Sequence, residues 1–371
     1  MKDRPISEGS NSQPADLRRY SRQVLCEQFG EDAQRRLMES KVVLFGCGAL
    51  GTVLAETLVR AGVGFLRICD RDFIEEDNLQ RQVLFDETDI EANLPKARAA
   101  AEKLRRINST VGIESVVIDV NHTNIERLSE GADLLLDGTD NFETRFLIND
   151  FAVSHRTPWI YGAVIGTTGL VMPIIPHDTP CLRCVFEEAP PPEMNPTCDT
   201  AGVLGPAVML VAALQAVEAM KLLSGRRDDL TRGLANIDVW TGRVEWMNVQ
   251  NAYDKGDCPC CKRGELPFLK GERGGSSATL CGRNAVQVRV DPTTRVDLAA
   301  IAAKLERVAD TPVRFNRFML RATVDGHEMT LFPDGRAIVK GTDSPFRCHW
   351  FRLANRERSE VGCEVRRSRR I

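Results

Sequence analysis

The 371-residue sequence lacks several features that mark specialised classes of protein. Its 49 basic and 52 acidic residues leave a formal net charge of -3, which gives no electrostatic basis for bulk binding to nucleic acid or to an anionic membrane. No apolar run approaches the ~20 residues of a membrane span, and the polar N-terminus contains no apolar signal core. We therefore expect a soluble, cytoplasmic protein whose partners are neither nucleic acid nor membrane.

Histidine is scarce, whereas cysteine is plentiful. The five histidines show no metal-ligand spacing, so we expect them in ordinary surface or loop positions. The twelve cysteines include two C-x-x-C pairs, Cys181 with Cys184 and Cys258 with Cys261. In a reducing compartment such pairs favour a metal over a disulfide, and four thiolates favour a closed, structural zinc site. The alternative is a set of buried or unrelated thiols, and Cys260 could replace Cys261 only with poor spacing.

Apolar strands and helices alternate through the first half of the chain. The expected strands lie at 41–46, 65–70, 113–118 and 132–137, and the expected helices at 52–61, 95–107 and 142–155, with one more helix between the last two strands. This alternation predicts a mostly parallel sheet with helices on both faces. Beyond it, a glycine-rich β-like stretch (162–176) precedes a long apolar helix at 205–223, expected in the core or in a dimer interface.

Changes in composition predict five segments. They are a disordered N-terminus (1–15), a large α/β domain (16–250), a linker that carries the second cysteine pair (251–278), a small α+β module (279–355) and a basic tail (356–371). The module contains a predicted helix at 298–308 and hairpin turns at Asp325-Gly326 and Asp334-Gly335.

A glycine fingerprint follows the first strand. Gly46-x-Gly48-x-x-Gly51 lies between a strand and a helix, where glycines let the backbone approach phosphates and the helix N-terminus offers N–H groups. Asp70 ends the next strand, where a carboxylate can bind ribose hydroxyls. This set does not separate NAD from ATP, and a tight turn without a ligand has the same pattern.

A cluster of polar residues follows the second strand. It contains Asp70, Asp72, Asn78, Arg81, Gln82 and Lys96. A nicotinamide needs a flat apolar cleft, whereas a triphosphate needs cations and amides that offset charge growing on the α-phosphate. The cluster therefore favours ATP, although each cation taken singly also fits a solvated surface position.

Asp140 and Asn141 close the motif D-G-T-D-N after another apolar strand. Open α/β sheets bind ligands at this end of their strands, and a carboxylate there suits Mg²⁺. The alternative role for Asp140 is to cap the following helix.

Cys198 lies in a proline-rich, irregular stretch before a helix. A partly exposed thiol near a helix N-terminus can have a lowered pKa and act as a nucleophile. The alternative is an unreactive loop cysteine.

The order of these motifs resembles the MoeB/ThiF family, the bacterial relatives of ubiquitin-activating enzymes. The resemblance rests on R-Y-S-R-Q, G-C-G-A-L-G, D-x-D, N-L-Q-R-Q, L-P-K, D-G-T-D-N and the two C-x-x-C pairs, and covers about residues 17–262. It implies a Rossmann-like sheet extended by antiparallel strands, in a homodimer. The implied activity is ATP-dependent adenylation of the C-terminal Gly-Gly carboxylate of a ubiquitin-like sulfur-carrier protein.

The resemblance also implies roles for single residues. Asp70 would hold the ribose, Asp140 the magnesium ion, and a group of three, Asn78, Arg81 and Lys96, the phosphates. Arg22 would enter from the other subunit as an arginine finger. Ala49 replaces a glycine found in many members, but a backbone N–H contact survives there. Cys198 matches a cysteine that in some members takes part in sulfur transfer from a donor such as a cysteine desulfurase or a rhodanese-like protein.

Two other functions fit part of the sequence. An NAD-dependent oxidoreductase explains the glycines but leaves Arg22, Arg81 and Lys96 without a task. A non-catalytic partner of a ubiquitin-like protein is disfavoured because every expected nucleotide residue is present. The carrier (for thiamin, molybdopterin or another pathway) stays open, and we expect the C-terminal module to be an interaction module.

Overall fold

The chain forms two compact units, residues 1–274 and 275–371. The computed structural model describes residues 17–188, 198–273, 279–280, 285–288, 296–333, 335 and 337–341. The predicted disordered N-terminus, most of the proline-rich stretch before Cys198 and the basic tail lie outside the described residues.

The first unit contains an eight-stranded mixed sheet in the order β3-β2-β1-β4-β5-β6-β7-β8. Its strands are β1 (Lys41–Phe45), β2 (Phe65–Asp70), β3 (Gly112–Val117), β4 (Leu134–Asp137), β5 (Trp159–Ile165), β6 (Thr168–Ile174), β7 (Leu234–Asp238) and β8 (Arg243–Met247). The pairings from β3 to β5 are parallel, and those from β5 to β8 are antiparallel. The predicted parallel sheet with an antiparallel extension is confirmed.

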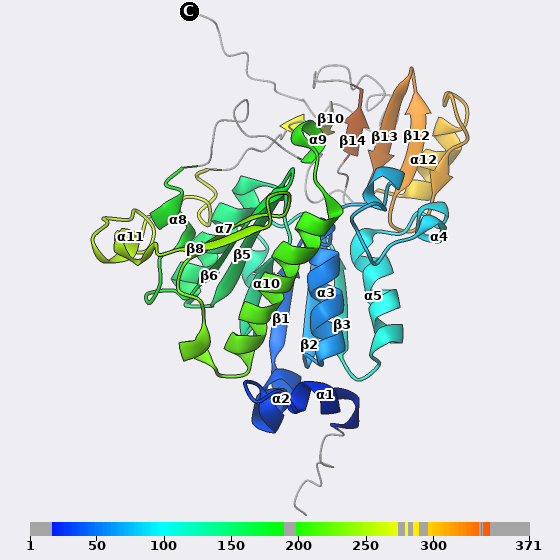
Figure 1. The fold of residues 1–371 in the computed structure, drawn as a ribbon. Helices are drawn as coiled ribbons and strands as arrows, with labels where there is room; N and C mark the ends of the chain where they lie inside the picture. The colour runs from blue at the N-terminus through cyan, green and yellow to red at the C-terminus, as the bar shows by residue number, and fades with distance from the viewer. Residues whose placement is uncertain are drawn as a thin grey trace, which may run out of the picture. The chain divides into compact units, whose positions relative to one another are not determined.

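Helices cover both faces of this sheet (Figure 1). The longer ones are α2 (Gly30–Glu39), α3 (Ala49–Ala61), α5 (Lys96–Ile107), α7 (Phe142–His155) and α10 (Gly205–Leu223), and the short ones are α1 (Ser21–Val24), α4 (Glu87–Glu91), α6 (Ile125–Leu128), α8 (Leu182–Val185), α9 (Cys198–Ala201) and α11 (Gln250–Asp254). Single 3-10 turns are η1 (Arg18–Tyr20), η2 (Glu76–Asn78) and η4 (Arg227–Asp229). Helices α3, α5 and α10 pack on one face, and α6 and α7 on the other.

Strand β1 shows why the sheet is covered twice. Val42 and Leu44 face the core under α3 and α10, whereas Val43 and Phe45 face the core under α7. All four side chains are buried. A strand buried on both faces must be apolar throughout, which is why K-V-V-L-F does not alternate with polar residues.

Helix α10 corrects one expectation. Its 19 residues are long and apolar enough to cross a membrane by length and composition alone, contrary to our expectation that no such run is present. The helix instead packs against α3, β5 and β6, and Val208, Val211 and Ala212 are fully buried there. It is apolar because it is a core helix.

Three boundaries differ from those expected. Helix α3 begins at Ala49 rather than at residue 52, because helical geometry starts directly after Gly48. Helix α5 begins at Lys96, with Pro95 extended at the N-cap position. The segment expected to be a linker packs on the first unit as far as residue 273, where Phe268 stacks on Phe146 of α7 with ring centroids 5.1 Å apart.

The second unit has its own sheet, in the order β11-β12-β13-β14-β10-β9. Its elements are β9 (Thr279–Leu280), β10 (Ala285–Val288), α12 (Leu298–Leu305), β11 (Arg314–Phe315), β12 (Leu320–Val324), β13 (His327–Leu331) and β14 (Ala337–Lys340). The predicted turn at Asp325-Gly326 joins β12 to β13, and both residues have positive φ, as a two-residue hairpin turn requires. Apolar residues of α12 and of the central strands form a separate core.

Candidate active site

The three fingerprint glycines have different structural tasks. Gly46 has φ +87°, and a Cβ there would lie 2.5 Å from the Gly138 oxygen. A Cβ at Gly51 would lie 2.1 Å from the Gly46 oxygen, so neither position accepts a side chain. At Gly48 the nearest atom to a Cβ would be Gln82 Nε2, at 3.8 Å. Gly48 therefore borders open space at the start of α3, where N–H groups and the helix dipole favour a phosphate.

The carboxylate of Asp70 is tied to this turn. Its Oδ2 accepts a hydrogen bond from the Cys47 N–H at 2.5 Å, and its Oδ1 accepts one from the Asp72 N–H at 2.6 Å. Burial, together with the nearby charge of Asp72, raises the pKa of Asp70, and the charge of Lys96 opposes that rise. Asp70 thus lies beside the glycine turn, in the position expected of a ribose-binding acid.

Lys96 lies on the same side of the sheet as Asp70. Its side chain is buried, its Nζ is 3.7 Å from Asp72 Oδ2, and its N–H donates to the Asp72 carbonyl at 2.9 Å. Placement at the first residue of α5 directs the ammonium group to the end of β2 rather than into solvent. The alternative interpretation of Lys96 as a solvated surface cation is therefore wrong.

The segment that begins with η2 supplies the other phosphate candidates. Asn78 is buried; its Oδ1 accepts from the Glu75 N–H at 3.3 Å and its Nδ2 donates to Asp77 Oδ1 at 2.7 Å. Arg81 Nη1 donates to the Asp77 carbonyl at 2.6 Å. Gln82 is buried with its amide towards Gly48, and its Oε1 has no hydrogen-bond partner among the residues described. A buried polar atom without a partner costs free energy, so its place beside the turn fits a polar ligand.

The Asp140 turn packs directly against the glycine turn. A Cβ at Gly138 would lie 2.5 Å from the Gly46 oxygen and 2.9 Å from the Gly51 Cα. Asp140 is exposed, and the helix cap is its neighbour: Asn141 Oδ1 accepts from the Thr144 N–H at 2.8 Å. The cap role is therefore filled by Asn141, and the carboxylate of Asp140 fits the donor chemistry of a magnesium site.

Sequence reasoning missed Arg71, the middle residue of D-R-D. Its Nη1 lies 2.8 Å from Asp119 Oδ1 beyond β3, and its Nε lies 3.6 Å from Asp72 Oδ1. Burial lowers the pKa of Arg71, but the carboxylates of Asp72, Asp119 and Asp140 raise it, with a net rise. The available signal was its position between two acids already singled out.

Arg22 is remote from this cluster within the same chain. The neighbouring Gln23 donates from Nε2 to the Ala61 carbonyl, at the C-terminal end of α3, at 3.1 Å. The glycine turn lies at the other end of this 13-residue helix, about 18 Å away at ~1.5 Å per residue. Figure 1 accordingly shows α1 at the end of the sheet where β1 begins. Cys198 is the first residue of α9, and its side chain lies outside the described residues.

The four predicted metal ligands meet at one point. The sulfur atoms of Cys181, Cys184, Cys258 and Cys261 lie within 4.8 Å of one another. The closest pairs are Cys184 with Cys261 at 3.4 Å and Cys181 with Cys258 at 3.6 Å. A tetrahedron with Zn–S bonds of ~2.3 Å has edges of ~3.8 Å, so the cluster fits zinc.

Cys260 turns away from this cluster towards α7. Its Sγ lies 3.3 Å from Asn149 Nδ2 and 3.5 Å from Asp150 Oδ1. The same two side chains hold the cysteine-bearing segments, since Asn149 Oδ1 accepts from the Leu182 N–H at 2.7 Å and Asp150 Oδ2 accepts from the Phe268 N–H at 3.0 Å. Helix α7 therefore joins both halves of the metal site.

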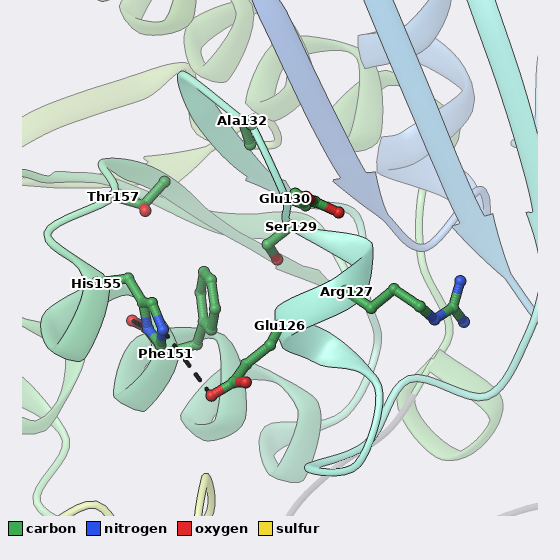
Figure 2. Close-up of a pocket in the computed structure, with 9 residues that line it drawn as sticks. Glu126, Arg127, Ser129, Glu130, Ala132, Phe151, His155 and Thr157 are labelled. Carbon is green, nitrogen blue, oxygen red and sulfur yellow. Dashed lines mark hydrogen bonds and ion pairs between the residues drawn. The ribbon is translucent and has the colours of Figure 1, made fainter.

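A cavity of about 490 Å³ lies elsewhere, between α6 and the end of α7 (Figure 2). Its lining includes Glu126 and His155, whose Oε1 and Nε2 are 3.9 Å apart, and Phe151, which stacks on His155 with ring centroids 4.2 Å apart. Ala132 precedes β4 and Gly138 follows it, so the cavity and the nucleotide turn lie at opposite ends of this strand. None of the residues assigned to the nucleotide lines this cavity.

Comparisons with known proteins agree with this geometry. The ThiF family matches residues 20–260. The chain is 44% identical over 326 residues to the sulfur carrier protein ThiS adenylyltransferase of Bacillus subtilis strain 168, covering 88% of this chain and 95% of that protein. It is 39% identical over 248 residues to the protein of the same name from Escherichia coli K12, covering 66% of this chain and 95% of that one. The match of 326 residues exceeds the first unit and so extends into the second.

Solved structures support the fold of the first unit. The crystal structure of E. coli MccB superposes with a TM-score of 0.57 and 24% identity, covering 67% of this chain and 72% of that one. At this identity the likeness establishes the α/β fold and nothing about the substrate. The family match over residues 20–260 and the identity to the B. subtilis and E. coli proteins lead to one conclusion: the chain belongs to the ThiF family.

Proposed function

We propose that the chain is an ATP-dependent adenylyltransferase that activates the C-terminal carboxylate of a ubiquitin-like sulfur-carrier protein for thiamin biosynthesis. The B. subtilis and E. coli relatives, both named as ThiS adenylyltransferases, support this function. The observation that carries it is the open space at Gly48, bordered by the unpartnered amide of Gln82 and set at the same sheet edge as Asp70 and Lys96. A cytoplasmic location is part of the proposal, because the thiol cluster needs a reducing compartment.

In the proposed reaction the carrier's terminal carboxylate attacks the α-phosphorus of ATP. A new bond forms between carboxylate oxygen and phosphorus, the bond to the bridging oxygen breaks, and pyrophosphate leaves with its electron pair. Asp70 holds the ribose, whereas Arg81 and Lys96 offset charge on the phosphates. Bound Mg²⁺, held by Asp140, would supply further positive charge. Positioning and charge stabilisation suffice for this step, and no protein nucleophile is needed.

We further propose that the active unit is a homodimer in which Arg22 completes the partner's site. Two observations support this arrangement: Arg22 lies about 18 Å from the glycine turn of its own chain, and α10 exposes an apolar stripe. Met209, Leu210 and Val217 on that stripe are 49%, 37% and 48% exposed. An exposed apolar helix face of this kind fits contact with a second copy.

The later steps and the zinc site complete the proposal. A sulfur donor, a cysteine desulfurase or a rhodanese-like protein, converts the acyl-adenylate to a thiocarboxylate with release of AMP, directly or through Cys198. Zinc held by the four thiolates is structural, because four protein ligands leave no open coordination position. The second unit serves as an interaction module for the carrier or the dimer.

The first experiment is ATP–pyrophosphate exchange with the purified chain and a panel of small Gly-Gly-tailed carriers. Exchange that requires one carrier and is lost in Asp140→Ala supports the adenylyltransferase. Absence of exchange with every carrier, despite ATP binding, contradicts it. The Cys198→Ser variant tests the later step, and unchanged thiocarboxylate formation would remove Cys198 from it.

Complementation between inactive variants tests the dimer. Arg22→Ala and Asp140→Ala chains are unfolded together, refolded and assayed as a 1:1 mixture. If Arg22 acts across the interface, half of the dimers are mixed and each has one intact site, so about a quarter of the wild-type rate returns. If it acts within its own chain, no activity returns.

A further inference from the structure

A buried ion pair lies beneath the Asp140 turn. Asp137, the last residue of β4, is 0% exposed, and Arg145 of α7 is 6% exposed. The two meet at 3.0 Å between Arg145 Nε and Asp137 Oδ2. Neither residue borders the open space at Gly48, and the proposed reaction gives neither of them a task.

The pair grips the residue that precedes Asp140 on both sides of its backbone. Asp137 Oδ1 accepts from the Thr139 N–H at 2.9 Å and from its hydroxyl at 2.7 Å. Arg145 Nη2 donates to the Thr139 carbonyl at 2.8 Å. That carbonyl belongs to the peptide bond that leads into Asp140, so the pair fixes the direction in which Asp140 leaves the sheet.

The guanidinium group is itself fixed from three directions. Its carbon atom lies 5.5 Å from the ring centroids of both Phe142 and Tyr161. Nη2 also donates to the Gly162 carbonyl on β5, at 3.2 Å. A planar fork with several donors can make these contacts together, whereas a lysine ammonium cannot.

Stability alone is a poor reason to keep this pair. Removing two charges from water costs several kcal/mol, and a buried ion pair is often no more stabilising than apolar residues of the same volume. The pair is better explained by the turn that it holds. The Asp140 carboxylate also lies close enough to Arg145 to be among the groups that act on its pKa, although burial and Asp137 act more strongly.

We propose that Arg145 is a positioning residue that sets the carboxylate of Asp140 for the magnesium–nucleotide complex. The inference rests on the proposed role of Asp140 and adds a residue that touches neither metal nor nucleotide. It places the effect of Arg145 on Mg²⁺-dependent binding and not on nucleotide binding as such. Residues that orient a metal ligand from behind typically contribute 10- to 100-fold to metal affinity.

Binding calorimetry with the full chain and a non-hydrolysable ATP analogue, with and without Mg²⁺, tests the proposal. For Arg145→Lys we expect the gain in affinity caused by Mg²⁺ to fall about 10-fold or more, with metal-free affinity unchanged. In the exchange assay the Mg²⁺ concentration for half-maximal rate rises by the same factor. Arg67→Lys is the matched control, because Arg67 also binds a carboxylate (Glu114) and a main-chain carbonyl (Leu128), but remote from the turn.

A second variant covers the case in which Arg145→Lys does not fold. The double variant Asp137→Asn/Arg145→Gln replaces the ion pair with an amide pair and leaves no charge unpaired. We expect it to show the same loss of Mg²⁺ dependence, with folding checked by Tm and by bound zinc. A folded variant of either kind with wild-type Mg²⁺ dependence, or with equal losses in the presence and absence of Mg²⁺, overturns the proposal. Because calorimetry needs no carrier, this result is separable from failure of the adenylation assay.

Discussion

The nucleotide turn and the cysteine cluster are built on opposite principles. At the turn, Asp140 is exposed, Arg81 is half-buried and the buried Oε1 of Gln82 has no partner among the described residues. At the cluster, the thiols lie 3.4 to 3.8 Å apart, and α7 holds both segments through Asn149 and Asp150. One region leaves polar groups available for a ligand that enters and leaves, and the other surrounds a ligand that stays.

The difference separates rate from stability. A side chain at the turn interacts mainly with the nucleotide, so its removal should lower the rate and leave the fold intact. A thiol of the cluster interacts with a metal that joins distant segments, so its removal should lower stability first. Each prediction below tests one side of this contrast.

The largest effect is expected for Arg81→Ala. Loss of a charge-stabilising group at the phosphates should lower kcat/KM of ATP–pyrophosphate exchange by about 10²- to 10³-fold. Tm should change by less than about 2 °C, since the retained contact is one hydrogen bond to the Asp77 carbonyl. Arg98→Ala is the control, because Arg98 pairs with Glu102 on the surface of α5. A large fall in Tm would show that Arg81 is structural.

The next effect is expected for Cys184→Ser, measured by zinc content and thermal unfolding. Loss of one of four thiolates should reduce bound zinc well below one equivalent and lower Tm by about 5 °C or more, since structural zinc contributes folding free energy. Cys26→Ser, at an exposed thiol outside the cluster, should leave both quantities unchanged. Full zinc occupancy in Cys184→Ser would contradict the four-thiolate site.

Two alanine substitutions divide the glycine turn. Gly46→Ala forces a Cβ onto the Gly138 carbonyl at a positive φ, so we expect destabilisation of about 1–3 kcal/mol. Gly48→Ala meets only Gln82 at 3.8 Å and should unfold almost as the wild type does, but with weaker ATP binding. Denaturant unfolding and nucleotide titration measure the two. Equal stability losses would mean that Gly48 is also a packing glycine.

The smallest effect is expected for Cys260→Ser. Its thiol contacts Asn149 and Asp150 rather than the other four sulfurs, so zinc content should stay at the wild-type value. Free energy of unfolding should fall by about 1 kcal/mol through altered packing of a buried side chain. Zinc loss comparable to that in Cys184→Ser would make Cys260 a ligand.

The sequence predicted those parts of the site that depend on local order. The fingerprint, Asp70 and the two cysteine pairs lie at ends of elements, and strand–helix alternation brings such ends to one sheet edge. The start of α3 was misplaced because Ala49, Leu50 and Gly51 belong both to the fingerprint and to the helix. Asp140 could not be separated from Asn141 as the helix cap, because the choice depends on one hydrogen bond to Thr144.

What could not be predicted depends on contacts between distant residues. Arg145 becomes significant only when α7 carries it beneath the turn after β4, where it reaches Gly162 on the next strand. Gln215 of α10 donates to the Asp137 carbonyl across 78 positions of sequence. Neither residue has a motif, because each is defined by what surrounds it in the folded sheet.

The contact between Gly46 and Gly138 has a consequence for protein engineering. The two turns approach so closely that each occupies the space in which the other would place a side chain. A loop transplanted from a relative into one turn alone would meet a backbone shaped for a different neighbour. Exchange of nucleotide specificity by grafting should therefore transfer both loops as one cassette, since the pair is inherited and altered as a single structural unit.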